Sequence, residues 1–169
     1  MRITNVQVVT PDEVVDRAYV RIGEGRIVEV GEAGGKPRPD EEVFDGEGRT
    51  LLPGFVDLHN HGALGSDFMD GEPGVLEKMS RFLARHGVTG FLATTTAAPA
   101  ETLSARIELA RECIAAGLGG AKCLGMHFEG PYLNTDLCGM HPGRYCRLPD
   151  PAEYRPWLDS GMVRRMTAS

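Results

Sequence analysis

Alternating strand-type and helix-type patterns, from about residue 50 onward, limit the possible folds of this chain more than any other feature. Apolar and β-branched runs predict strands over residues 51–61, 88–96, 121–128 and 162–166. Apolar residues at helical spacing predict helices in between, over residues 75–86, 100–116 and 151–158. Repeated strand–helix units predict an α/β fold with a parallel sheet, either open or closed into a barrel.

The first 50 residues have a different character and contain only strand-type patterns. These predict short strands over residues 3–10, 18–22, 26–30 and 42–44. Gly23-Glu24-Gly25 is typical of a hairpin turn, because glycine readily adopts positive φ. We expect a small β-sandwich segment over residues 1–50, followed by the first βα units of a barrel over residues 51–169.

Two histidines stand at the end of the first predicted strand of the βα region. His59 and His61 are two residues apart, so a strand directs both imidazoles to the same face, together with Asp57. Two neutral imidazoles on one face can bind a single divalent cation. The alternative interpretation is a pair of histidines that only form hydrogen bonds.

The third predicted strand of this region repeats the pattern. His127 and Glu129 fall on one face, whereas Leu124, Met126 and Phe128 fall on the other, which we expect to lie under the helices. Ligand-type side chains at the carboxyl ends of parallel strands are typical of a TIM-barrel active site. The chain has no Gly-X-Gly-X-X-Gly or P-loop motif, which disfavours a nucleotide-binding sheet.

Composition excludes several other classes of protein. The formal net charge is −6 and no basic cluster is present, which argues against a nucleic-acid partner. No run of about 20 apolar residues is present for a membrane helix, and the N-terminus does not resemble a signal peptide. Four cysteines without Cys-X-X-Cys spacing indicate free thiols in a reducing, cytoplasmic setting.

Two segments resemble known enzymes. Pro53-Gly54-Phe55-Val56-Asp57-Leu58-His59-Asn60-His61-Gly62, after a β-rich segment, resembles the amidohydrolase superfamily. Gly125-Met126-His127-Phe128-Glu129-Gly130-Pro131-Tyr132-Leu133-Asn134, followed by Gly139-Met140-His141, resembles the N-acetylglucosamine-6-phosphate deacetylase family within it. The resemblance spans essentially the whole chain. It implies the N-terminal part of a TIM (β/α)8 barrel, with about three to four strands.

The resemblance also implies a set of site residues and a reaction. His59, His61 and Glu129 would bind a divalent metal, zinc or iron. His141 would contact the substrate and polarise its amide carbonyl, with Met140 beside it in the substrate-binding stretch. The implied reaction is hydrolysis of the acetamide of N-acetylglucosamine 6-phosphate to glucosamine 6-phosphate and acetate, a step of amino-sugar catabolism. A glutamate ligand disfavours the hydantoinases and dihydroorotases, many of which use a carboxylated lysine.

Chain length conflicts with a complete barrel. A TIM barrel takes about 250 residues, and roughly 120 follow the N-terminal segment. In the family, two later metal histidines, a phosphate-binding arginine and a catalytic aspartate would follow Ser169. We therefore expect a fragment or a truncated reading frame with little turnover alone. Separately, we expect a homodimer for the full-length enzyme. The alternatives are a dihydroorotase-like or deaminase-like amidohydrolase, and a non-catalytic fragment that self-associates through open sheet edges.

Four further residues have weaker interpretations. His127 either orients a metal ligand or is a hydrogen-bonded structural histidine. His86 is expected to stabilise the end of a helix. Asp57 is expected to brace the strand end rather than to catalyse, and Cys138 to be an ordinary loop thiol.

Overall fold

The structure, a computed structural model, describes all residues from 1 to 169. It divides into two compact units, Met1–Pro53 and Gly54–Ser169, and each is described by itself.

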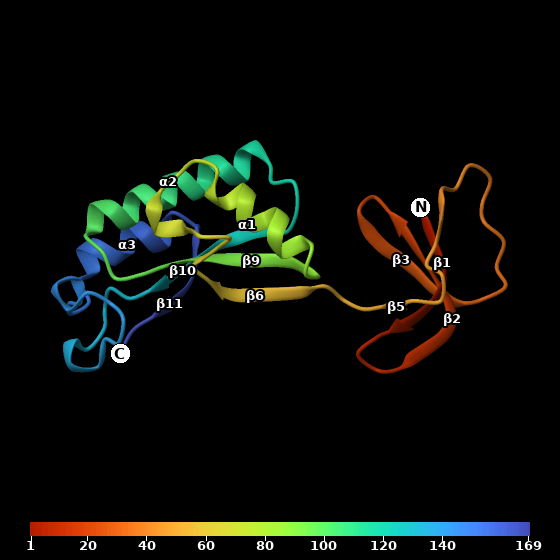
Figure 1. Ribbon diagram of the computed structural model, residues 1–169, viewed down its shortest axis with the longest axis horizontal. Coiled ribbons are helices and arrows are strands. Elements are labelled where there is room, and N and C mark those ends of the chain that lie inside the picture. The colour runs from red at the N-terminus through yellow and green to blue at the C-terminus, as the bar shows by residue number, and fades with distance from the viewer. The chain divides into compact units, whose positions relative to one another are not determined.

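The N-terminal unit is a five-stranded mixed sheet (Figure 1). Its central strand β1 is antiparallel to β2 and parallel to β4 and β5, while β3 pairs with β2. The bounds are β1 Arg2–Val9, β2 Val14–Gly23, β3 Arg26–Glu32, β4 Val43–Asp45 and β5 Thr50–Leu51. Apolar residues of the central strands form its small core: Val6, Val8, Ala18 and Val20.

The predicted hairpin turn is present between β2 and β3. Gly23 pairs with Arg26, so the loop contains only Glu24 and Gly25. Both loop residues have positive φ, 51° and 71°, as a two-residue turn of the I′ type requires.

One predicted strand is divided between the two units. Residues 51–61 were expected to form a single strand, but β5 ends at Leu51 and pairs with β1, whereas β6 begins at Phe55 in the second unit. Pro53 explains the break, because proline has no N–H to donate to a strand ladder.

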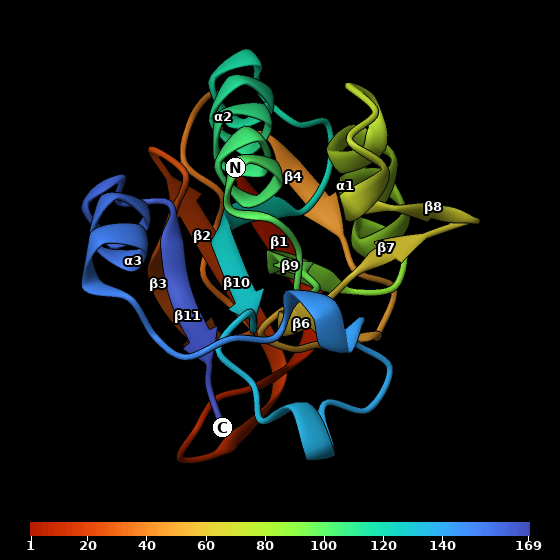
Figure 2. The same cartoon turned by 90° about the vertical axis from the view of Figure 1, so that its left-hand side faces the viewer.

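The C-terminal unit contains a four-stranded parallel sheet of order β11-β10-β9-β6. Strands that follow one another along the chain are neighbours, which is the arrangement of a barrel, whereas a doubly wound sheet reverses its strand order. All three α-helices lie on one side of this sheet (Figures 1 and 2). The bounds are β6 Phe55–Asn60, α1 Val75–Ala84, β9 Val88–Thr95, α2 Ala100–Ala116, β10 Lys122–Glu129, α3 Pro151–Asp159 and β11 Val163–Thr167.

Short elements fill two connections of this unit. A small hairpin and a 3₁₀ turn follow β6, and two 3₁₀ turns lie between β10 and α3. Their bounds are β7 Gly62–Ala63, β8 Ser66–Asp67, η1 Phe68–Asp70, η2 Thr135–Leu137 and η3 Gly143–Tyr145.

The main core lies between the helices and the parallel sheet. The predicted helical spacing is confirmed: α1 contributes Leu76 and Met79 to this core, and α2 contributes Leu103 and Ile107. Trp157 of α3 is also buried, and its indole N–H donates to the Ser104 hydroxyl at 3.0 Å. No helix of the protein is both long and apolar enough to span a bilayer.

A bulge in β10 corrects one sequence expectation. Leu124 was expected under the helices, but it is 44% exposed and Cys123 takes the buried position instead. Between Cys123 and Met126 β10 advances three residues while β9 advances two. Gly125 lies in this bulge and has φ 131°, a backbone conformation that residues other than glycine rarely adopt. Alternation resumes after the bulge, so Met126 faces the helices as predicted.

An ion pair in the N-terminal unit depends on pH. Arg21 Nε lies 2.6 Å from Glu41 Oε1, and both side chains are largely buried. The hydrogen bond from Arg21, and then that from the Arg38 amide, lower the pKa of Glu41 to about 2. A carboxylate with a depressed pKa stabilises the fold above its unfolded-state pKa, and this stabilisation is lost as the pH falls toward the folded-state value.

We predict that acid weakens the N-terminal sheet as the pH falls from about 4.5 toward 2, and that Glu41→Gln removes this part of the pH dependence. Thermal melts of both proteins between pH 6 and pH 2.5, followed on β2 and β3 amides by NMR, measure it. Glu47→Gln is the matched control, because Glu47 pairs with Arg49 on the exposed surface. Equal pH profiles for the wild type and Glu41→Gln would contradict the prediction.

The parallel sheet ends in two open edges, β6 and β11. β6 also exposes large apolar side chains: Phe55 is 66% exposed, Val56 54% and Leu58 49%. Open edges with apolar side chains favour association between chains.

We predict that the 169-residue chain self-associates in a concentration-dependent way, and that Val56→Lys weakens this association. Sedimentation velocity over a range of concentrations is the measurement. Leu137→Lys, at a loop residue that is 80% exposed, is the control and should not change the distribution. A wild-type chain that stays monomeric at every concentration would refute this expectation.

Candidate metal centre

The end of β6 is braced by its own polar side chains. Asp57 accepts the His59 amide at 3.1 Å and the Asn60 side-chain amide at 2.8 Å. The side-chain oxygen Oδ1 of Asn60 accepts the Gly62 backbone N–H at 3.0 Å, and the Asn60 backbone N–H donates to the Thr94 hydroxyl at 2.8 Å. These bonds hold the backbone on both sides of each histidine, so the expected bracing role of Asp57 has a geometric basis.

The face of Asp57 differs from the sequence expectation. Asp57 was placed on the same face as His59 and His61, but it bonds the side chain of Asn60, three residues away. Between Asp57 and Asn60 β6 advances three residues while β9 advances two. This extra residue puts Asp57 and Asn60 on one face, which an ideal strand would not do.

His59, His61 and Glu129 converge at the carboxyl ends of β6 and β10. The Nε2 atoms of His61 and His59 lie 3.1 Å and 3.9 Å from the same oxygen, Oε2 of Glu129. One ligand atom from each residue lies within 4.8 Å of the others. The side chains are 44%, 25% and 23% exposed for His59, His61 and Glu129, so solvent reaches the group.

His141 approaches the same oxygen from the loop between β10 and α3. Its Nε2 lies 3.5 Å from Glu129 Oε2, and the residue is 9% exposed. Its Nδ1 accepts the backbone N–H of Ala97 at 3.1 Å. A neutral His141 that accepts at Nδ1 must carry its proton on Nε2. The ring therefore presents a hydrogen-bond donor, rather than a metal ligand, toward the group.

Two other predicted residues lie differently. Met140 is 78% exposed, although its neighbour His141 is buried. His86 lies beyond α1, where its Nδ1 is 2.8 Å from the Phe82 carbonyl oxygen. A histidine that bonds a carbonyl of the last helical turn is a structural one, as predicted.

His127 lies between β11 and the converging side chains of His59, His61 and Glu129. It is fully buried, and its Nε2 lies 2.8 Å from the Thr167 hydroxyl. Its ring contacts that of His59 edge to face, with centroids 5.0 Å apart. Burial, and then the charge of Arg165, lower the pKa of His127 to about 4, so the ring is neutral near pH 7. A neutral, fixed ring is suited to supporting His59 through contact.

Several residues that support these histidines had not been identified from the sequence. Asn60 could have been found, because it lies between the two histidines of the motif. Thr94 and the backbone of Ala97 give no sequence signal, since they act only through the way β9 lies beside β6 and near the loop of His141.

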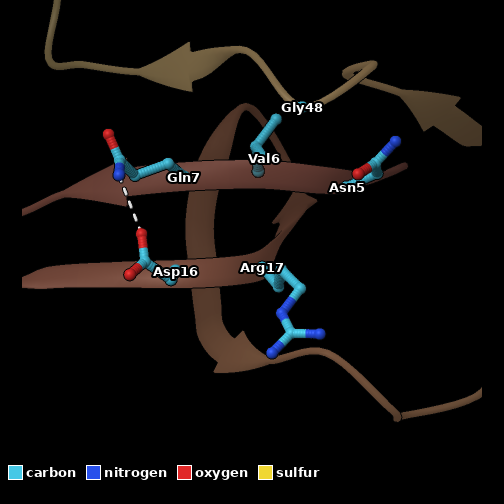
Figure 3. A pocket seen from close by; sticks show the side chains of 6 residues that line it. All are labelled: Asn5, Val6, Gln7, Asp16, Arg17 and Gly48. Carbon is cyan, nitrogen blue, oxygen red and sulfur yellow. Dashed lines mark hydrogen bonds between the residues drawn. The ribbon is translucent and has the colours of Figure 1, made fainter.

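A second concave surface, in the N-terminal unit, has no comparable chemistry. Figure 3 shows this cavity of about 350 Å³, in which the Gln7 side chain donates to Asp16 at 2.8 Å. The Gln7 carbonyl oxygen accepts the Thr50 hydroxyl, and Asn5 donates to Asp45. Its polar side chains Asn5, Gln7 and Asp16 thus bond neighbouring side chains of the same sheet, which is the pattern of a structural surface.

The three converging residues suit a divalent cation. Two imidazole nitrogens and a carboxylate oxygen are donors that zinc and ferrous iron accept. Nδ1 of His61 is buried without a hydrogen-bond partner, whereas its Nε2 lies toward Glu129. Three protein ligands with solvent access are typical of a catalytic metal site, because structural sites are closed by a fourth protein ligand.

Comparison with known proteins gives a consistent result. No protein-family model matches the chain. N-acetylglucosamine-6-phosphate deacetylase of Bacillus subtilis is 34% identical and is matched over 98% of this chain and 43% of the relative. N-acetylgalactosamine-6-phosphate deacetylase of Escherichia coli is 34% identical, over 87% of this chain and 37% of the relative.

A solved structure agrees with these relatives. N-acetyl-D-glucosamine-6-phosphate deacetylase of Mycobacterium smegmatis, as a variant in complex with N-acetyl-D-glucosamine 6-phosphate, has a TM-score of 0.82 and 34% identity. The match covers 100% of this chain and 43% of that chain. The chain matches the N-terminal portion of the N-acetylglucosamine-6-phosphate deacetylases. It spans less than half the length of these deacetylase relatives.

More distant structures share the fold alone. An amidohydrolase at 20% identity has a TM-score of 0.56. Atrazine chlorohydrolase of Arthrobacter aurescens, solved with zinc, has a TM-score of 0.54 at 19% identity. Together with the deacetylase match, they confirm the expected α/β fold of the amidohydrolase superfamily.

We predict that the chain binds a divalent cation and that His61→Ala weakens zinc binding by at least about 100-fold. Removal of a ligand should lower the metal affinity by more than the roughly 10–100-fold seen when a residue that only orients a ligand is removed. Isothermal titration with zinc on the metal-free chain measures the affinity. His86→Ala removes a histidine that bonds only a helix end and is the matched control. Unchanged affinity in His61→Ala would exclude this group as the binding site.

Proposed function

We propose that this site serves the hydrolysis of the acetamide of N-acetylglucosamine 6-phosphate, which gives glucosamine 6-phosphate and acetate. The observation that carries the proposal is the convergence on Glu129 of two ligand-type imidazoles and one donor-type imidazole. Metal-assisted amide hydrolysis uses a cation site and benefits from a separate hydrogen-bond donor for the carbonyl oxygen. This arrangement has both within one group of side chains.

In this proposal His59, His61 and Glu129 hold the cation. Zinc is our first choice, since its common catalytic sites combine two histidines with a glutamate, and ferrous iron is the second. When bound, the cation acts as a Lewis acid and lowers the pKa of a water molecule at the site. Asp57 and Asn60 keep the two imidazoles in place through their bonds to the strand end.

The Nε2–H group of His141 donates a hydrogen bond to the amide carbonyl oxygen of the substrate. Negative charge develops on this oxygen as the carbonyl carbon becomes tetrahedral, so a fixed donor stabilises the transition state more than the ground state. The Ala97 N–H fixes the donor, because it occupies Nδ1 and leaves the proton on Nε2. Burial of His141 keeps competing water away from this bond.

Two relatives suggest the substrate class. The Mycobacterium smegmatis structure contains N-acetyl-D-glucosamine 6-phosphate, which favours this substrate. The Escherichia coli relative is a deacetylase of N-acetylgalactosamine 6-phosphate, and this epimer is the second candidate.

The two buried cysteines, Cys123 and Cys146, are unpaired, which supports a reducing, cytoplasmic location.

Because the chain spans 43% of the Bacillus subtilis relative, we test the proposal in a chimera that joins residues 1–169 to the part of that relative following the matched segment. We predict that the zinc-loaded chimera releases acetate from N-acetylglucosamine 6-phosphate. We predict that His141→Asn lowers its kcat by about 100- to 1000-fold, as loss of one transition-state donor typically does. His86→Asn is the matched control and should leave kcat unchanged.

Assays with N-acetylgalactosamine 6-phosphate and dihydroorotate distinguish the substrate classes. A folded chimera that opens dihydroorotate and releases no acetate would overturn the proposal. If the chimera prefers N-acetylgalactosamine 6-phosphate, the proposed substrate would be wrong but the proposed deacetylation reaction would stand.

A further inference from the structure

The loop that carries His141 is attached to the turn after β9 at two adjacent residues. The Ala97 N–H donates to His141 Nδ1 at 3.1 Å. The next residue, Ala98, accepts Nη1 of Arg147 through its carbonyl oxygen, also at 3.1 Å. One donor and one acceptor of this short turn are therefore used by one loop, and His141 and Arg147 are six residues apart along it.

Arg147 is bonded on every side. Its Nη2 lies 2.6 Å from Glu153 Oε1, and its Nε lies 3.0 Å from Glu153 Oε2, a two-point contact between a guanidinium and a carboxylate. Its Nη1 also donates to the Tyr145 carbonyl oxygen at 2.8 Å. The Arg147 amide donates to the Pro131 carbonyl oxygen at 3.0 Å, which closes the loop on itself.

Tyr132 completes this network from the start of the loop. It is 2% exposed, stacks on Trp157, and donates its hydroxyl to Glu153 Oε2 at 2.7 Å. Burial raises the pKa of Glu153, but the hydrogen bonds from Arg147 and Tyr132 outweigh it and hold this pKa below its ordinary value. Glu153 therefore stays ionised near pH 7, and Arg147 keeps a charged partner.

We propose that Arg147 is a positioning residue for His141. By fixing the Ala97–Ala98 turn against the loop, it keeps the Ala97 N–H on Nδ1 and the His141 proton on Nε2, directed toward Glu129. Arg147 does not touch the converging side chains itself. The catalytic consequence rests on the proposed function, whereas the effect on the His141 ring is independent of it.

The rival explanation is that Arg147 only anchors α3 through Glu153. Both explanations predict a less stable loop when Arg147 is removed. Only the positioning role predicts a change in which nitrogen of the neutral His141 ring carries the proton, together with faster exchange of the Ala97 amide.

The test is NMR of the metal-free 169-residue chain with 15N-labelled histidine, at a pH above the pKa of imidazole in water. His141→Asn assigns the His141 signals, and five histidines keep the spectrum simple. We expect a proton-bearing Nε2 and a proton-free Nδ1 in the wild type. In Arg147→Met we expect a mixture of both ring tautomers and about tenfold faster exchange of the Ala97 amide, the cost of one hydrogen bond.

Arg144→Met is the matched control, because Arg144 lies in the same loop, is exposed, and makes no ion pair but stacks on Tyr145. It should leave the His141 signals and the Ala97 exchange rate unchanged. Arg147→Lys provides a second variant if Arg147→Met does not fold. Lysine keeps the charge beside Glu153, but it lacks the planar fork that reaches Glu153, Ala98 and Tyr145 together.

Protected β9 and β10 amides show that a variant is folded. Folded Arg147→Met or Arg147→Lys with wild-type His141 signals and wild-type Ala97 exchange would overturn the positioning role. A changed ring together with an inactive wild-type chimera would keep the positioning role and reject the proposed function.

Discussion

Convergence on one carboxylate oxygen of Glu129 is the interaction on which the rest of this site depends. Three imidazoles reach that oxygen, two from the end of β6 and one from the loop after β10. They meet because β6, β9 and β10 are parallel and end at the same edge of the sheet. A carboxylate in this position can share a cation with two rings while it keeps the third ring close.

His141, His61 and His127 differ because the surroundings of each ring differ. At His141 the Ala97 N–H occupies Nδ1, so the ring is a donor. At His61 Nδ1 has no partner, and Nε2 lies nearest to Glu129. At His127 burial lowers the pKa to about 4, so the neutral ring contacts His59 without adding a positive charge beside the group. In the proposed site, one residue type would thus supply ligand, donor and support, depending on the surroundings of each ring.

Much of this arrangement could be predicted from the sequence. The spacing of apolar residues gave the three helices, and parallel strand ends were enough to expect Glu129 beside His59 and His61. The extra residues in β6 and β10 could not be predicted, because a bulge depends on how neighbouring strands pair, and they moved Asp57 and Leu124 to other faces. The break at Pro53 was readable in principle, since proline interrupts a strand ladder.

The partner that decides the role of His141 is a backbone group. Every amino acid except proline supplies an amide hydrogen at position 97, so ordinary side-chain replacement there leaves the donor in place. Ala97 is buried, so only small side chains fit there, but each of them would retain the same amide donor and therefore the same imidazole tautomer. Mutations would therefore disturb the bond between the Ala97 N–H and His141 mainly by changing the contacts that hold the turn in place.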